Sequence, residues 1–101
     1  MGILVTEQHF ATEQDAVAEI ADRGWYSTGV IDFPAREAEF HAHDYDAVVF
    51  VLDGTARLQV EDGSFMQCGA GARVEIPAGV VHRESSPAFR AISGTSTELD
   101  R

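Results

Sequence analysis

The chain has 101 residues, 45% of them hydrophobic, which is enough for one domain with a single core and argues against a disordered segment. Seventeen acidic residues against seven arginines give a net charge of −10, which disfavours binding to the phosphate backbone of nucleic acids. No apolar run approaches the ~20 residues of a transmembrane helix, and Met1-Gly2-Ile3 does not begin a signal peptide. The single cysteine, Cys68, permits no internal disulfide, which suits a reducing cytoplasm. From the charge, the apolar runs and the cysteine together we expect a cytoplasmic protein without nucleic-acid or membrane partners.

The first 24 residues predict an extension outside the main fold. Ile3 to Val5 form a short apolar stretch typical of an edge strand, which could also pair with a partner subunit. Residues 11–23 predict a helix, because Thr12 is a suitable N-cap, Asp15 follows three residues later, and an apolar stripe then repeats at helical spacing. Gly24 is suited to its end. We expect this helix to be a lid or a flank on the outside of the fold.

From Trp25 onward the pattern changes to short strands. Two Asp-Gly pairs, Asp53-Gly54 and Asp62-Gly63, predict hairpin turns. The expected strands cover residues 25–33, 37–43, 47–52, 56–60, 65–68, 73–76, 80–84 and 88–92. Short strands at such regular spacing predict an all-β sandwich or barrel. We expect a single domain over residues 1–101, with the extension at 1–24, the barrel at 25–93 and a polar tail at 94–101.

Three histidines in two distant segments are the main functional signal. His41 and His43 share one face of the expected strand, because alternate side chains point to the same side about 6.6–6.8 Å apart. Two imidazoles at that spacing can converge on one ion through bonds of about 2.0–2.1 Å. His82 ends the segment GARVEIPAGVVH, in which glycine and proline punctuate a short strand. We therefore expect the barrel to bring His82 against His41 and His43.

These segments resemble the two signature motifs of the cupins, which are small jelly-roll β-barrels. The matching positions are Gly71, Pro77, Gly79 and His82 in the second motif, and His41, His43 and Gly54 in the first. The chain departs from the family pattern at Ala35, where glycine is usual, at Ala47, where the ligand glutamate is usual, and at Ser86, where asparagine is frequent. The resemblance implies a cupin-type jelly-roll barrel over about Phe33 to Ile92, with a short N-terminal helix.

The resemblance also implies a metal site. Its ligands would be His41, His43 and His82, and its ion a divalent transition metal such as Fe, Zn, Ni, Cu or Mn. Without a glutamate at position 47 the site resembles that of three-histidine cupin dioxygenases, with a position open for water, O₂ or a chelating substrate. Asp46 should face away from it. Glu84, two residues after His82, should share its inward face as a fourth ligand or an acid/base group, the alternative being an exposed charge near the barrel mouth.

Two classes of function remain open. The first is a metal-dependent enzyme of dioxygenase type that acts on a small chelating substrate, such as a diketone, a phenol or a carboxylate. An isomerase, epimerase or lyase would use the same metal. The second class is a non-enzymatic small-molecule sensor or storage barrel. The family resemblance further implies a homodimer, with Ile3 to Val5 as the candidate contact.

Several other side chains have both a structural and a functional interpretation. Aromatic residues on barrel strands are core or pocket lining, Cys68 is a small buried hydrophobe, and His9 is a surface residue or a subunit contact. Arginines on strands form outward salt bridges unless one points inward to bind a carboxylate substrate. The aromatic residues in question are Tyr45, Phe50 and Phe65, and the arginines are Arg57, Arg73 and Arg90.

Overall fold

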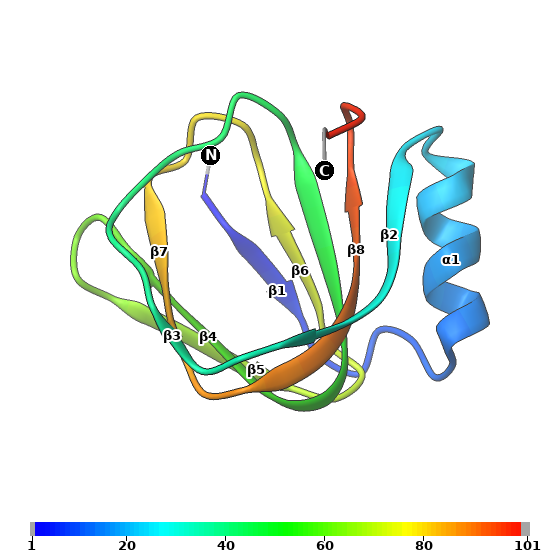
Figure 1. The fold of residues 1–101 in the computed structure, drawn as a ribbon, viewed down its shortest axis with the longest axis horizontal. Coiled ribbons are helices and arrows are strands. Elements are labelled where there is room, and N and C mark those ends of the chain that lie inside the picture. The colour runs from blue at the N-terminus through cyan, green and yellow to red at the C-terminus, as the bar shows by residue number, and fades with distance from the viewer. Residues whose placement is uncertain (1, 100–101) are drawn as a thin grey trace.

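The computed structural model describes residues 2–99, which form one helix and a single eight-stranded sheet curled into a barrel (Figure 1). The elements are β1 (Leu4–Thr6), α1 (Glu13–Asp22), β2 (Tyr26–Phe33), β3 (Arg36–Glu37), β4 (Ala47–Val60), β5 (Phe65–Gly69), β6 (Arg73–Ile76), β7 (His82–Ser86) and β8 (Phe89–Thr95). This confirms the expected all-β jelly-roll barrel with a short N-terminal helix. Within the described range, the helix is too short and too polar to cross a membrane.

Strand β4 is the centre of the barrel, because each half of it has different partners. Its first half pairs with β6 and β8, and its second half pairs with β5 and β7, all antiparallel. The hairpin expected at Asp53-Gly54 is therefore wrong: the strand bends there and continues. Gly54 has φ +83°, and a Cβ on it would lie 2.8 Å from the carbonyl oxygen of Ala88. A side chain at this position would collide with the connection into β8, so the glycine permits the bend.

The strand expected over residues 37–43 is also wrong. Only Arg36–Glu37 forms a strand, β3, which pairs with β7, while His41 makes an isolated bridge with His82. Glu37 pairs with Ser85 and His41 with His82, so the chain takes four residue steps on this segment where β7 takes three. The extra residue interrupts the ladder in the manner of a β-bulge. The expected turn at Asp62-Gly63 does form, between β4 and β5.

Helix α1 lies outside the barrel beside β2 (Figure 1). Thr12 caps it as expected: the amide of Asp15 donates to Thr12 Oγ1 at 3.1 Å, and the amide of Thr12 donates to Asp15 Oδ2 at 3.0 Å. Ile20 is buried on the outer face of the sheet, where Phe50 also packs. Alternate β4 residues face the barrel interior instead, beginning with Ala47. The helix thus covers a wall of the barrel as a flank.

Candidate metal centre

The structure brings the three motif histidines together. His82 opens β7, His41 is bridged to it through both backbone groups, and His43 follows two residues later. The ring centroids are 4.7 Å apart for His41 and His82, 5.0 Å for His41 and His43, and 5.4 Å for His43 and His82. One ring nitrogen from each residue lies within 4.8 Å of the other two. The convergence expected from the sequence is present, although His41 and His43 do not lie on a regular strand.

Backbone carbonyls orient two of the three rings. His41 Nδ1 donates a hydrogen bond to the carbonyl of Glu39 at 2.8 Å, and His82 Nδ1 donates to the carbonyl of Val80 at 2.9 Å. Since a carbonyl oxygen can only accept, each Nδ1 carries the hydrogen, and Nε2 of the neutral ring keeps its lone pair. Partners of this kind fix the ring orientation of metal-binding histidines. Sequence reasoning missed these carbonyls, because any residue supplies one.

The third ring, that of His43, is held beside Tyr45 with their centroids 4.8 Å apart. Burial lowers the pKa of His43, and the neighbouring His41 and His82 lower it further. The lowered pKa favours the neutral imidazole, which is the form that binds metals. Burial also raises the pKa of Tyr45, as do the negative charges of Asp44 and Glu84, so its hydroxyl stays protonated at neutral pH.

Glu84 lies at the same centre. Its Oε2 is 3.4 Å from His41 Nε2 and 3.6 Å from His82 Nε2. The sequence-based placement of Glu84 on the inward face beside His82 agrees with this geometry. Asp46 is directed elsewhere, as expected, because its carboxylate accepts the amide hydrogen of Ala78 at 2.8 Å.

The histidine centre opens into a cavity of about 320 Å³ inside the barrel. His43, His82 and Glu84 line one part of it, and most of the remaining wall is apolar. Phe33 and Phe89 stack in this wall with their ring centroids 4.9 Å apart. Other apolar or small residues of the wall are Ile31, Ala47, Val49, Ala56, Leu58, Val74 and Ile76. Such a lining suits a small molecule with a polar head and an apolar body.

The remaining aromatic and cysteine candidates divide between cavity, core and surface. Tyr45 lines the cavity, Phe50 is buried beneath the helix, and Phe65 is exposed under the guanidinium of Arg57 at 5.0 Å. Cys68 is buried in the barrel core, and burial, with a smaller contribution from the negative charge of Glu7, raises the pKa of its thiol. It is therefore a hydrophobic core residue, in agreement with the expectation.

The arginines contact other residues outside the histidine centre. Arg57 Nε donates to the carbonyl of Ser85 at 2.6 Å, although the residue also borders the cavity. Arg90 Nε forms an exposed ion pair with Asp32 at 2.8 Å. Arg73 bonds to an acidic residue of the helix. The expectation of outward salt bridges holds for Arg73 and Arg90.

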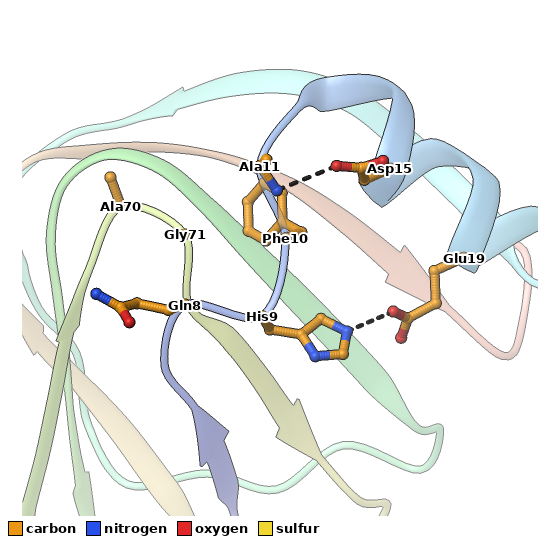
Figure 2. Close-up of a pocket in the computed structure, with 8 residues that line it drawn as sticks. All are labelled: Gln8, His9, Phe10, Ala11, Asp15, Glu19, Ala70 and Gly71. Carbon is orange, nitrogen blue, oxygen red and sulfur yellow. Dashed lines mark hydrogen bonds and ion pairs between the residues drawn. The ribbon is translucent and has the colours of Figure 1, made fainter.

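His9 belongs to a second polar cluster at the surface, where its side chain is 25% exposed, and the alternative of a subunit contact stays a prediction. Its Nε2 donates to Glu19 Oε1 of α1 at 2.7 Å, and Arg23 and Arg73 each donate to Glu19 Oε2 at 2.8 Å. Figure 2 shows the contact between His9 and Glu19. It lies beside an outer hollow of about 640 Å³, where the chain before α1 passes the turn at Gly71. The hollow shares no lining residue with the barrel cavity. This cluster fastens the helix to the barrel.

The donor set at the histidine centre fits a divalent transition metal. Imidazole nitrogens bind Fe(II), Zn(II), Ni(II), Cu(II) and Mn(II). Two bonds of about 2.1 Å to one ion place the two bound nitrogens at most about 4.2 Å apart. The ring nitrogens here lie within 4.8 Å of one another, so a movement of each ring by no more than about 1 Å would let them share one ion. Two carbonyl-oriented rings and an adjacent carboxylate oxygen without a hydrogen-bond partner in residues 2–99 are consistent with such an ion.

Comparisons with known proteins agree with the fold. The family described as Cupin domain matches residues 30–88. No curated protein matches the chain. Acireductone dioxygenase from Bacillus anthracis, solved with a cadmium ion in its active centre, is 19% identical with a TM-score of 0.69, covering 94% of this chain and 78% of its own. A DUF861 family protein from Thermotoga maritima is 16% identical with a TM-score of 0.63, covering 90% of this chain and 96% of its own.

A third similar structure is that of the DMSP lyase DddQ from Ruegeria pomeroyi. It is 27% identical with a TM-score of 0.57, and the match covers 71% of this chain but only 38% of the lyase. The jelly-roll barrel, the motif residues at their expected spacing and the match over residues 30–88 together show that this chain belongs to the cupin family, as a small cupin-domain protein.

Proposed function

We propose that this cupin is a metal-dependent enzyme of dioxygenase type, which acts on a small chelating substrate through a metal bound by His41, His43 and His82. The observation that carries the proposal is the convergence of three ring nitrogens within 4.8 Å of one another at a cavity. The lowered pKa of His43 favours its neutral, metal-binding form, and backbone carbonyls orient the rings of the other two histidines.

Each part of the site has a role in this function. A divalent ion bound there would supply Lewis-acid or one-electron chemistry to the substrate. Three neutral imidazoles add no negative charge, so a divalent ion would keep a net positive charge even with the Glu84 carboxylate beside it, which favours a substrate that presents anionic oxygens, such as a diketonate, a phenolate or a carboxylate. Glu84 is placed to act at the same centre, either on the metal or on a substrate proton.

The cavity supports a small substrate with an apolar body. Its volume of about 320 Å³ lies at the lower end of the roughly 300–1,000 Å³ typical of ligand pockets. The stacked Phe33 and Phe89 and the aliphatic wall would hold the body of the molecule and exclude water from it. The histidines would hold its polar head.

The test begins with metal analysis of the purified protein and continues with O₂ consumption in the presence of diketones, phenols and carboxylates. We expect stoichiometric transition metal and substrate-dependent O₂ uptake that is lost in His43→Ala and retained in His9→Ala, since His9 lies in the other cluster. A protein that binds metal but consumes no O₂ while converting a substrate would be an isomerase, epimerase or lyase. O₂ uptake that survives in His43→Ala would contradict the proposed site.

A second candidate is a non-enzymatic small-molecule-binding barrel. It is favoured by Ala47, which stands where the family motif has its ligand glutamate. In that case the purified protein would contain no metal, and it would bind small apolar molecules equally well with and without a chelator. Calorimetric titration of the candidate substrates under both conditions separates this function from the first.

We also propose that the chain forms a homodimer through β1. This strand ends the path β1-β6-β4-β7-β3 through the sheet, and Leu4 on it is 55% exposed. An unpaired strand edge with an exposed apolar side chain favours association with a second copy. Light scattering should give a dimer mass that falls to the monomer mass in Leu4→Lys. A wild-type monomer at micromolar concentration would refute this arrangement.

A further inference from the structure

We propose that Glu84 is the fourth ligand of the metal, so that this barrel carries its ligand carboxylate on β7 instead of β4. This inference rests on the proposed metal site and goes beyond it by fixing the role of Glu84. The key atom is Oε2, which lies 3.4 Å from His41 Nε2 and 3.6 Å from His82 Nε2. Oε2 is buried and has no hydrogen-bond partner among residues 2–99.

In the state that binds metal, with both rings neutral and the carboxylate ionised, the three atoms that meet at this point are all acceptors. His41 and His82 each use their Nδ1 hydrogen on a backbone carbonyl, so the Nε2 atoms of the neutral rings present lone pairs. An ionised carboxylate is likewise an acceptor only. A buried polar atom without a partner is costly, and three facing acceptors add electrostatic repulsion. A cation between them would satisfy all three at once.

The position of Glu84 in the fold makes this arrangement specific. Glu84 follows His82 by two residues on β7, so both side chains point into the barrel, and Leu58 of β4 pairs with Glu84. The family motif has its ligand glutamate at position 47 on β4. Ala47 also lines the cavity here, but its side chain is only a methyl group. The second oxygen of Glu84, Oε1, lies on the side of the exposed Arg36, whose Nη1 is 3.9 Å away. Only Oε2 is therefore directed at the histidines.

The alternative is an ion pair between Glu84 and a protonated His41 or His82. The two arrangements predict opposite effects of Glu84→Gln on the metal-free protein. If Oε2 faces two lone pairs, the neutral amide should leave the melting temperature of the metal-free protein unchanged or raise it. If Oε2 faces an imidazolium, removal of the charge should lower that melting temperature.

The experiment measures Zn(II) affinity by calorimetry and thermal unfolding in the presence of a chelator, for wild type, Glu84→Gln and Glu37→Gln. Glu37 is the matched control, because it lies on β3 beside β7 and is 67% exposed on its side chain. We expect the Zn(II) Kd to rise at least about tenfold in Glu84→Gln, because loss of a residue that only supports a metal ligand already costs about 10–100-fold. In Glu37→Gln the Kd should stay within about twofold of wild type. We expect no loss of melting temperature in metal-free Glu84→Gln.

An unchanged Kd in Glu84→Gln would overturn the inference, and so would a lower melting temperature of the metal-free variant. An equal loss of affinity in Glu37→Gln would reduce the effect to net charge and would also overturn it. If Glu84→Gln does not fold, Glu84→Asp keeps the charge but withdraws the carboxylate by one methylene, and it should show the same loss of affinity. Wild type that binds no Zn(II) would instead refute the proposed metal site, a result distinct from all of these.

Discussion

Two clusters in this molecule pair histidine with glutamate, and they differ in whether the oxygens of the glutamate have hydrogen-bond donors. At the helix, His9 Nε2 lies 2.7 Å from Glu19 Oε1, and two arginines bind the other oxygen at 2.8 Å. Burial of Glu19 raises its pKa, but these three donors outweigh burial and lower it to about 2. In the barrel, Glu84 Oε2 meets two histidine nitrogens at 3.4 and 3.6 Å without a hydrogen-bond partner in the described chain.

The difference separates a structural role from a binding role. A carboxylate whose two oxygens both accept from side-chain donors needs no further group, and Glu19 in this state stabilises the contact between α1 and the barrel. A buried carboxylate oxygen without a donor, directed at two imidazole nitrogens, is costly by itself and is suited to receive a cation between these atoms. The same two residue types therefore serve different purposes, which their sequence context alone does not distinguish.

The largest expected effect is on metal affinity in His41→Ala compared with His9→Ala. The two side chains are similarly exposed, at 31% for His41 and 25% for His9. Loss of a direct ligand should weaken Zn(II) binding by more than the roughly 10–100-fold typical of outer-shell partners, whereas His9→Ala should keep the wild-type Kd. Calorimetric titration measures both. Equal losses of affinity in the two variants would remove the distinction between the clusters.

The next effect is on stability in Glu19→Gln. Loss of a carboxylate that accepts from one histidine and two arginines should reduce the free energy of unfolding by about 1.5–3 kcal/mol, measured by urea denaturation, with no change in Zn(II) affinity. Because the folded pKa of Glu19 is about 2, below its ordinary value of 4.5, its contribution is full above about pH 4.5 and is lost as the pH falls towards 2. The variant should show a flatter stability profile over that interval. An equally steep profile would contradict this role of Glu19.

A smaller effect is expected when a carboxylate is restored from β4. In the double variant Ala47→Glu/Glu84→Gln, the new glutamate at position 47 of β4 would point into the cavity, because Ala47 lines it. We expect it to recover about tenfold in Zn(II) affinity, or about 1.4 kcal/mol, relative to Glu84→Gln. Calorimetry of the two proteins side by side gives this ratio. A double variant that folds but binds no better than Glu84→Gln would show that position 47 does not reach the metal.

The smallest effect is expected at the start of the helix. Thr12→Ala removes the Thr12 half of the capping box, and it should cost about 1 kcal/mol of stability while leaving Zn(II) affinity unchanged. Urea denaturation and calorimetry measure the two quantities. A change in metal affinity in this variant would mean that the helix and the histidine centre are coupled.

The sequence was sufficient to predict the fold class, because short strands alternate with turn residues. It was also sufficient to predict the convergence of the three histidines, because their spacing follows the two family motifs. It was misleading where local pattern and tertiary pairing differ. Asp53-Gly54 has the composition of a hairpin turn, yet the strand continues because its two halves find different partners. His41 and His43 were placed on one face by strand alternation, but the bridge from His41 to His82 and an interrupted ladder bring them together instead. The contact of His9 depends on Glu19 of α1, which Arg73 of β6 also binds, and it has no local signal in the sequence.

The most direct test of the account is X-ray absorption spectroscopy of the Zn(II)-loaded protein, which counts the imidazole rings and light-atom ligands around the metal. The account predicts three imidazoles, from His41, His43 and His82, and one carboxylate oxygen that disappears in Glu84→Gln. A metal surrounded by fewer than three imidazoles in wild type would contradict it.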